Sequence, residues 1–362
     1  MRNMLGGALV ALCLCAVVLA WPPASAPKEP DVVFEPYPEI VPRGYLCYRA
    51  SGPVTIDGKL DEAAWKAAPW SDDFIDIEGA AKPKPRHRTR MKMLWDDRFL
   101  YIAARLEEPH VWGTLTKHHS VIFQDNDFEV FLDPDGDGHL YAELELNALN
   151  TTWDLLLSRP YKDGGKAIDA WEIPGLRSAV HVEGTINDPR DADTAWTVEI
   201  AWPWKSLAEL SNTPSPPTEG DQWRINFSRV EWRHEVVGGK YRKIPKQRED
   251  NWVWSPQGVI DMHRPERWGI VQFSKDKPGA GAMRADPSAE ARHLLHRVYY
   301  AQRDFHKARK RWATSLGELR LSDAPYKAVR LETTSTGFEA SVPAKGTGRR
   351  WRIRSDARFW EE

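Results

Sequence analysis

A run of alternating aspartate and glycine, Asp133-Pro134-Asp135-Gly136-Asp137-Gly138-His139, points most directly to chemistry. Aspartates separated by glycine turns can bring several hard oxygen ligands onto one cation, which is the coordination that Ca²⁺ prefers. An EF-hand loop needs a glutamate at its twelfth position, where Leu144 stands, so this is not an EF-hand. The motif predicts either a structural calcium site at Asp133, Asp135 and Asp137 or an acidic turn with Asp and Gly in their usual roles.

Polar side chains alternate with apolar ones on both sides of this motif. The alternating polar positions are Glu129, Glu143, Glu145 and Asn147, and further along the chain Arg224, Asn226 and Ser228. If these strands are neighbours, carboxylates, amides and a guanidinium share one sheet surface. Beside aromatic rings, such groups suit the recognition of polyols. A solvated face with cross-strand charge pairs is equally consistent with the pattern.

Catalytic motifs are not evident. The chain has no nucleophile elbow, phosphate loop or dinucleotide fingerprint. A glycosidase needs two carboxylates across a cleft, and no spacing singles out such a pair. His118 and His119 are adjacent, and the remaining histidines show no metal-ligand spacing. We therefore expect a protein that is not an enzyme, with glycosidase activity as a minor alternative.

The elements that position these residues have an apolar period of two. It is clear in residues 99–106, 128–132, 142–147 and 196–201, and it predicts half-buried antiparallel strands. Many such strands separated by Gly, Pro, Asp and Asn indicate a mainly β fold, an antiparallel Greek-key β-sandwich of immunoglobulin or jelly-roll type. Short helical turns are expected only at residues 60–67 and 204–210.

Tryptophan is unusually frequent, with 18 copies. Its flat ring can fill a large β core or stack on a sugar, and the core is the better explanation for most copies. Five copies stand in turn or strand-edge contexts where exposure is plausible, although burial is favoured for each one taken alone. They are Trp112, Trp153, Trp171, Trp232 and Trp252.

The spacing of apolar residues changes from two to three and four residues near the C-terminus. Apolar residues from Ala291 to Trp312 step by three and four, which predicts an amphipathic helix of at least five turns. Residues 329–333, 338–342 and 351–354 read as short strands joined by Gly-containing turns. Together they predict a small α+β unit whose apolar stripe forms its own core, with a coiled-coil partner site as the weaker interpretation.

The remaining segments divide the chain. Residues 1–26 resemble a signal peptide or N-terminal anchor, with Arg2 before an apolar stretch. A Pro-rich linker follows at 27–44, then one large domain at 45–274, a second linker at 275–288 and the C-terminal unit at 289–362. We therefore expect an exported protein that is periplasmic, in the cell envelope or secreted, and membrane-attached only if the first segment is uncleaved. Cys13 and Cys15 fall in that segment, which leaves Cys47 without an internal disulfide partner.

Composition excludes some partners. The 362 residues contain 50 Lys plus Arg and 52 Asp plus Glu, so no overall positive field favours nucleic acid. The apolar share of 41% and charged share of 28% are those of an ordinary soluble globular protein.

Several blocks of the large domain, taken together, resemble the family 9 carbohydrate-binding module. They are Asp57-Gly58 with Trp65, Leu94-Trp95-Asp96-Asp97 leading into Leu100-Tyr101, and Asp127 to Asp133. The resemblance implies a β-sandwich that holds sugars, often with structural calcium. In sugar-binding members two Trp rings clamp a terminal sugar; here those positions are occupied by Phe123 and about Met262, beside His263. Glu129 matches the family's carboxylate, and Glu145 stands where its Arg is found.

The expected ligand-binding residues are thus Phe123, Glu129, Glu145, Asn147, Trp153, Asn226, Met262 and His263. The resemblance implies non-catalytic recognition of a glycan or oligosaccharide in polysaccharide catabolism, with Ca²⁺ as a structural cofactor. The alternative is a cell-envelope interaction or scaffold protein that reuses the sandwich and docks a protein partner through its C-terminal unit.

Overall fold

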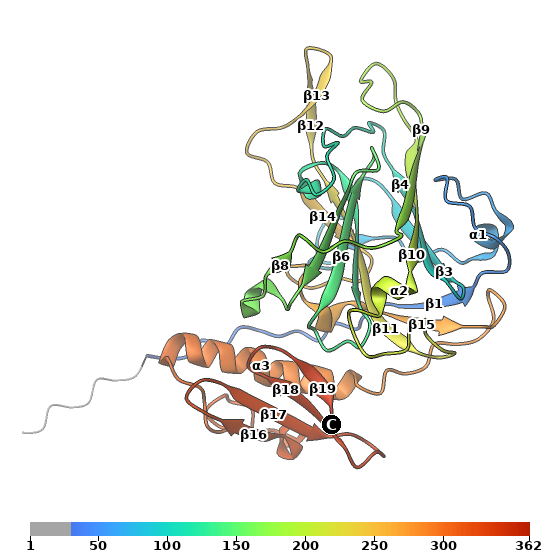
Figure 1. Ribbon diagram of the computed structural model, residues 1–362. Coiled ribbons are helices and arrows are strands. Elements are labelled where there is room, and N and C mark those ends of the chain that lie inside the picture. Colours follow the sequence, from blue (N-terminus) through green and yellow to red (C-terminus); the bar gives the residue numbers. More distant parts are fainter. Residues whose placement is uncertain (1–29) are drawn as a thin grey trace, which may run out of the picture.

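The computed structural model describes residues 30–362. Figure 1 shows a large β body, with a smaller unit of one long helix and one sheet packed against one end of it. The predicted signal segment, with Cys13 and Cys15, lies outside the described residues. Within residues 30–362, no helix combines the length and apolar character needed to cross a bilayer.

Most strands of the β body join a 13-stranded mixed sheet. Along its main path the order is β8 (Ala167–Ile168), β7 (Thr152–Leu157), β6 (Tyr141–Asn147), β5 (Asp127–Asp133), β11 (Gln222–Glu231), β15 (Gly269–Ser274), β1 (Gly44–Arg49), β3 (Thr89–Trp95), β4 (Phe99–Glu107), β10 (Ala195–Pro203) and β9 (Arg177–Glu183). Off this path, β14 (Asp250–Val253) pairs with β11 and with β2 (Ile75–Asp76).

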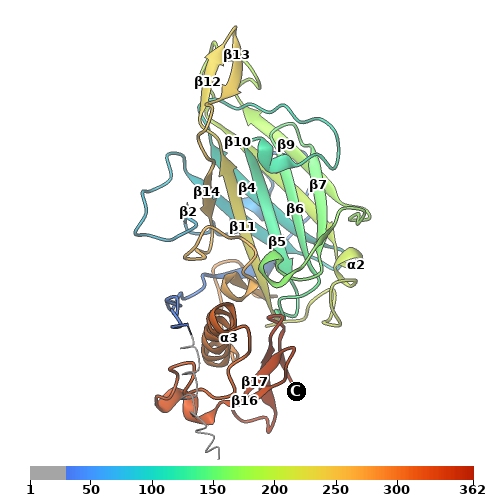
Figure 2. The same ribbon diagram turned by 90° about the vertical axis from the view of Figure 1, so that its left-hand side faces the viewer.

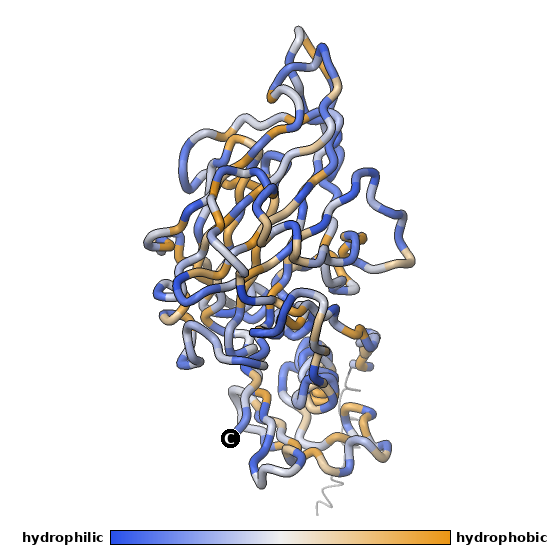
Figure 3. The backbone as a smooth tube through the Cα atoms, turned by 90° about the vertical axis from the view of Figure 1, so that its right-hand side faces the viewer, coloured by the Kyte–Doolittle hydropathy of each residue, from blue (hydrophilic) through white to orange (hydrophobic). Residues whose placement is uncertain are grey.

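The long sheet curls so that its two halves face each other as layers, one containing β5 to β7 and the other β4, β10 and β9 (Figures 1 and 2). Phe128 and Leu144 of the first layer share one buried core with Ile102 and Ile200 of the second. In Figure 3 the hydrophobic stretches follow the strands inside the body, whereas hydrophilic residues follow the outer loops. The prediction of a β-sandwich is confirmed in this form.

One strand departs from the antiparallel pattern. β1 pairs in parallel with both β15 and β3, whereas the other strand pairs of the described chain are antiparallel. Parallel neighbours cannot be joined by a tight hairpin and need a long crossover. Residues 50–88, which carry the short helix α1 (Ala63–Ala67) and β2, provide that crossover between β1 and β3.

The central strands are buried on both faces instead of one. All seven residues of β5 and all seven of β6 are buried. One face of each strand packs into the sandwich core. The opposite face is covered by a second apolar cluster that joins Phe131 and Tyr141 to Val253, Met262 and Trp268. The polar residues on that face therefore lie beneath a covering layer.

Tryptophan mainly fills the interior, as predicted. The fully buried copies include Trp65, Trp95, Trp196, Trp202, Trp254 and Trp268. Among the five candidates for exposure, Trp112, Trp171 and Trp252 are buried. Only Trp153 and Trp232 of the five are partly exposed.

The short elements complete the β body. The expected helical turns are present as α1 and α2 (Trp204–Leu207). Single 3-10 turns occur at η1 (Ile122–Gln124), η2 (Tyr161–Asp163) and η3 (Pro265–Arg267). The hairpin of β12 (His234–Val237) and β13 (Lys240–Lys243) projects at the end of the body far from the C-terminal unit (Figure 1).

The C-terminal unit has the predicted helix and sheet. Helix α3 (Ala289–Arg309) buries Ala291, Leu294, Val298, Ala301 and Phe305 against the unit's own core. Its sheet contains β16 (Arg330–Thr333), β17 (Phe338–Pro343) and β18 (Arg350–Arg354), with the turn η4 (Ala324–Ala328) before it. A fourth strand, β19 (Phe359–Glu361), was not predicted, because three residues are too few to show a period.

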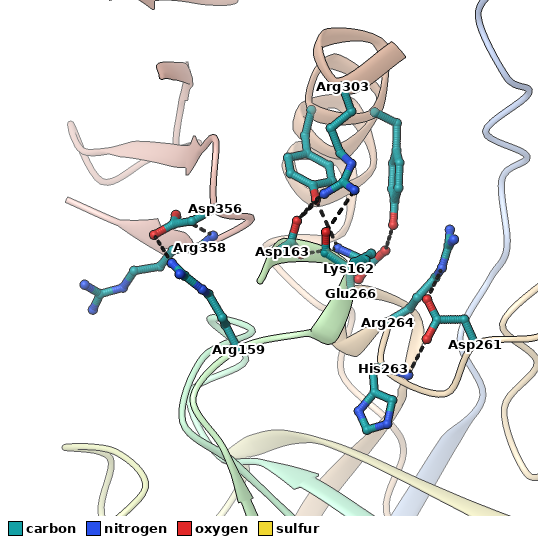
Figure 4. Close-up of polar contacts among 12 residues, drawn as sticks. Arg159, Lys162, Asp163, Asp261, His263, Arg264, Glu266, Arg303, Asp356 and Arg358 are labelled. Atoms are coloured by element: carbon teal, nitrogen blue, oxygen red, sulfur yellow. Dashed lines mark hydrogen bonds and ion pairs between the residues drawn. The ribbon is translucent and has the colours of Figure 1, made fainter. Parts of the chain in front are cut away.

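The C-terminal unit and the Pro-rich segment are both docked onto the β body. Residues 30–43 have no regular structure, as predicted, but they are not a free tether, because Tyr37 stacks on Tyr300 of α3 with ring centroids 4.8 Å apart. Figure 4 shows the polar contacts at this junction. Asp163 of η2 pairs with Arg303 and with Lys162, and Glu266 of η3 accepts a 2.6 Å hydrogen bond from Tyr300.

Candidate sugar-binding site

The floor of the candidate site is a row of side chains across neighbouring strands. In the strand register, Ser228 of β11 lies opposite Glu129 of β5, Glu129 lies opposite Glu145 of β6, and Glu145 lies opposite Trp153 of β7. Directly opposed residues project to the same face of a sheet. The covered face of β5 to β7 therefore presents two carboxylates and an indole side by side.

Loops close this row into a pocket of about 240 Å³. Its aromatic residues are Phe123, Phe131, Trp153 and Tyr161. Its acidic residues are Glu129, Glu143, Glu145, Glu249 and Asp261. Asn251, Met262 and His263 complete its polar and sulfur-containing lining. This combination of flat apolar rings and hydrogen-bonding groups is what sugar rings require.

Phe123 is held in place by its backbone. Its N–H donates a 2.8 Å hydrogen bond to Glu145 Oε2, and its carbonyl oxygen accepts a 2.8 Å bond from Trp232 Nε1. The Phe123 ring then lies near that of Trp153, with centroids 6.4 Å apart and planes 27° apart. Phe123 and Trp153 thus form one aromatic wall.

The opposite wall comes from the loop between β14 and β15. Met262 is fixed through its carbonyl oxygen, which accepts a 2.8 Å bond from Trp268 Nε1. His263 Nδ1 lies 2.8 Å from the Tyr141 hydroxyl. Burial lowers the pKa of His263 to about 4, so the imidazole is neutral at physiological pH.

The sequence prediction located much of this pocket. The predicted residues that line it are Phe123, Glu129, Glu145, Trp153, Met262 and His263. Whether they bind a ligand stays a prediction.

Asn147 and Asn226 were also predicted, but they do not line the pocket. Asn147 Nδ2 donates to the Leu115 carbonyl oxygen at 2.8 Å, and Asn226 exchanges hydrogen bonds with the main chain of Ser255. Both side chains are fully buried and hold loops onto the sheet.

The sequence did not single out Tyr161, Glu249, Asn251 and Asp261. Asn251 stands in the short strand β14, and the other three come from loops or turns folded over the sheet, so no period marks them. Glu143 was recognised as part of the polar face, and the structure places it in the pocket. Asp261 could have been suspected only because it precedes Met262 and His263 in the chain.

Burial dominates the electrostatics of the floor. It raises the pKa of Glu129 to about 7, and it raises the pKa values of Glu143 and Glu145 well above their ordinary range. Neighbouring carboxylates add to the effect, because like charges disfavour ionisation. Glu143 Oε2 is buried and finds no hydrogen-bond partner among the described residues.

The aspartate motif forms a compact acidic turn. Ligand oxygens of Asp133, Asp135 and Asp137 lie within 4.8 Å of one another, which is close enough for one cation. Burial and then its two neighbours raise the pKa of Asp133, so local positive charge does not compensate the cluster. Yet Asp133 already accepts backbone bonds from Gly136 and Gly138, and Asp137 accepts a 2.8 Å bond from Arg358. The carboxylates fit calcium, although Arg358 already interacts with Asp137.

A second group capable of holding a metal lies on the surface. His118, His119 and Glu172 place one ligand atom each within 4.8 Å of one another. The Nε2 atoms of the two histidines lie 3.2 Å and 2.9 Å from the oxygens of Glu172. Sequence spacing gave no sign of this group, because Glu172 comes from a distant loop.

Sequence comparison assigns the β body to a family. The family described as "Carbohydrate family 9 binding domain-like" matches residues 56–272, which is more than half of the chain. The chain belongs to this family. No curated protein is significantly similar to it in sequence.

The solved structures to which the chain is similar share little sequence identity with it. A family 9 carbohydrate-binding module from Caldicellulosiruptor kristjanssonii in complex with cellotriose is 17% identical, with a TM-score of 0.41 over 67% of this chain and 100% of that chain. A structure of a family 9 module from the same organism in complex with glucose is also 17% identical to this chain. Its TM-score is 0.41 over 66% of this chain and 100% of that chain. A protein from Bacteroides uniformis to which carbohydrate binding is attributed is 15% identical, with a TM-score of 0.49 over 65% and 100% of the two chains.

The first block that carries the family 9 resemblance, Asp57-Gly58 with Trp65, has a structural role. The backbone N–H groups of Asp57 and Gly58 donate to Glu199 Oε2, and Trp65 Nε1 donates to Oε1 of the same carboxylate at 2.6 Å. Gly58 has φ +84, and a Cβ there would lie 2.6 Å from His181 N. These residues fix the fold of the family 9 domain, and they lie outside the pocket lining.

The raised pKa of Glu129 predicts a pH dependence of stability. Between its ordinary value of 4.5 and about 7, the folded protein holds a proton that the unfolded chain releases. The free energy of unfolding should therefore increase as the pH falls through 7, with an upper limit of about 1.4 kcal/mol per unit of pKa difference. Glu129→Gln should be more stable than the wild type at about pH 8 and should show a weaker pH dependence.

Urea unfolding over this pH range measures the effect. Asp61→Asn, at an exposed position, is the matched control and should leave the profile unchanged. If the stability of Glu129→Gln varied with pH as that of the wild type does, the carboxyl group of Glu129 would not contribute to the pH dependence of stability.

Proposed function

We propose that the protein is an exported, non-catalytic carbohydrate-binding protein that recognises a glycan or oligosaccharide in polysaccharide catabolism. The observation that carries the proposal is the family 9 domain together with its pocket, in which an aromatic wall faces buried carboxylates. Aromatic faces stack on the apolar face of a sugar, and carboxylates accept hydrogen bonds from its hydroxyl groups.

The size of the pocket favours a short ligand. Its volume of about 240 Å³ is below the range of pockets that enclose drug-sized molecules. One sugar ring can enter, and the rest of a chain must remain outside. We therefore infer recognition of a single unit, such as the end of a chain.

Trp153→Ala should weaken glycan binding by at least about tenfold, because it removes half of the aromatic wall at a loss of roughly 1.4 kcal/mol or more. A soluble glycan array identifies the ligand, and affinity electrophoresis in polysaccharide gels measures the loss. Trp360→Ala, in the C-terminal unit, is the matched control and should migrate like the wild type.

Two other outcomes would replace this proposal. Turnover of an oligosaccharide that disappears in Glu129→Gln or Glu145→Gln would indicate a glycosidase. Absence of retardation by any glycan would favour an envelope scaffold that binds a protein partner through residues 289–362.

Export is proposed from residues 1–26, whose positive start and apolar stretch are those of a signal segment. The full chain should be found outside the cytoplasm on cell fractionation, and a chain lacking these residues should remain inside. Equal distribution of the two chains would exclude a targeting role.

We further infer that Asp133, Asp135 and Asp137 bind a structural Ca²⁺. An ion present at about 100 times its Kd would add roughly 2.7 kcal/mol to the free energy of unfolding. Ca²⁺ should therefore raise the Tm by several degrees, whereas Mg²⁺ should have less effect because it requires stricter octahedral geometry. Asp135→Asn, at an exposed position, should abolish the shift. An unchanged Tm would mean that the motif is only an acidic turn.

A further inference from the structure

The pocket is unusual in its charge. Five carboxylates line it, namely Glu129, Glu143, Glu145, Glu249 and Asp261. Within residues 30–362, no lysine or arginine side chain contributes to this lining. Arg264 pairs with Asp261 at 3.1 Å, but it too is absent from the lining residues. The ligand therefore meets a row of carboxyl groups without a lysine or arginine in the wall.

Two buried carboxylates elsewhere in the protein have positively charged partners. Asp163 pairs with Lys162 and Arg303. Glu266 is buried too, which raises its pKa, yet Lys162, His296, Tyr300 and Arg264 outweigh burial and lower it to about 2. In the pocket the neighbours act in the opposite direction, since Glu129, Glu143 and Asp127 all raise the pKa of Glu145. The carboxyl groups of the pocket floor thus lack the arginine and lysine partners that Asp163 and Glu266 have.

A buried acceptor without a hydrogen-bond partner borders this space. Glu143 lines the pocket and is only 4% exposed, yet its Oε2 has no hydrogen-bond partner among the described residues. Asp127, which lies next to the floor and is fully buried, also has an unpartnered oxygen, Oδ2. A buried acceptor without a donor costs about 1–3 kcal/mol, and more when it is charged. A donor supplied by the ligand would remove that cost.

The aromatic wall suits the same kind of ligand. Phe123 and Trp153 border a space that is also lined by Glu145. Aromatic faces attract cations, and the attraction strengthens when the cation is desolvated. Carboxylates and aromatic rings together form a cage for an ammonium group.

We propose that the pocket selects sugars that carry a free ammonium group, such as glucosamine units, over neutral and N-acetylated sugars. This inference rests on the proposed function, because the family 9 domain supplies the reason to expect a sugar. The ammonium group donates hydrogen bonds to Glu143 and its neighbours, and the sugar ring stacks on Trp153. Hydroxyl groups alone would leave the negative charge of the floor uncompensated.

Isothermal titration of the full chain with glucosamine, glucose and N-acetylglucosamine tests the proposal, because these probes differ at one substituent. Glucosamine should bind at least about tenfold more tightly than glucose or N-acetylglucosamine. This ratio is expected when the positive charge of a ligand meets an opposite charge in its site. Oligomers of β-1,4-linked glucosamine should show the same order against their acetylated counterparts. The preference should weaken as the pH falls through about 7, because Glu129 becomes protonated.

Substitutions of glutamate by glutamine distinguish the effect of the pocket's carboxyl groups from the effect of its shape. Glu143→Gln keeps the volume but removes the ionisable carboxyl group that would pair with an ammonium group, so it should lose the preference for glucosamine and keep whatever affinity glucose has. Glu249→Gln, at a partly exposed position of the lining, is a second variant and should reduce the preference by a smaller factor. Glu172→Gln, an exposed glutamate outside the pocket lining, should leave the preference intact.

Three other results would contradict the inference, and they differ in what they mean for the proposed function. Equal binding of glucose and glucosamine would reject it while the proposed function stands. Neutral-sugar binding that requires Ca²⁺ would also reject it, because Asp127, Glu129 and Glu145 have ligand atoms within 4.8 Å of one another and would then hold a metal. Failure of every glycan to bind would remove both the inference and the proposed function.

Discussion

The strand register of β11, β5, β6 and β7 is the constraint on which the site depends. It aligns Glu129 with Glu145 and Glu145 with Trp153 on one face, while Phe128 and Leu144 project into the sandwich core. Side chains alternate with a period of two, so a slip of one residue would turn the carboxylates into the sandwich core and the apolar set toward the covering layer. Because such a slip removes most of the core, the hydrophobic packing of the sandwich also fixes the position of the polar row.

The covering layer converts that row into a pocket. The loop between β14 and β15 is held by Trp268, which binds the Met262 carbonyl oxygen, and by Tyr141, which lies against His263. The same loop continues into η3, where Glu266 accepts a hydrogen bond from Tyr300 of α3. The C-terminal unit thus supports the loop that forms one wall of the pocket, which gives residues 289–362 a structural role beside any partner they bind.

The pocket is maintained against an electrostatic cost. Like charges directly opposite each other in a sheet are destabilising, and burial strengthens the repulsion. The Glu129 and Glu145 pair has this arrangement, and Glu143 adds a third buried carboxylate. Some other buried acids have arginine or lysine beside them, as Asp163 does. A cluster without such partners that lines a cavity is the pattern expected of a binding site in which the ligand completes the electrostatics.

The sequence by itself determined the β class, the helix α3 and the polar face of β5 and β6, because strand and helix periods are local properties of the chain. The family resemblance placed Phe123 and Met262 on the two walls. Only the tertiary structure decided that β1 enters the sheet in parallel, that Asn147 and Asn226 serve loops instead of the pocket, and that Tyr161 and Glu249 reach the site. These features depend on contacts between segments that are distant in sequence, and hydrophobic periodicity does not encode which loop covers which face.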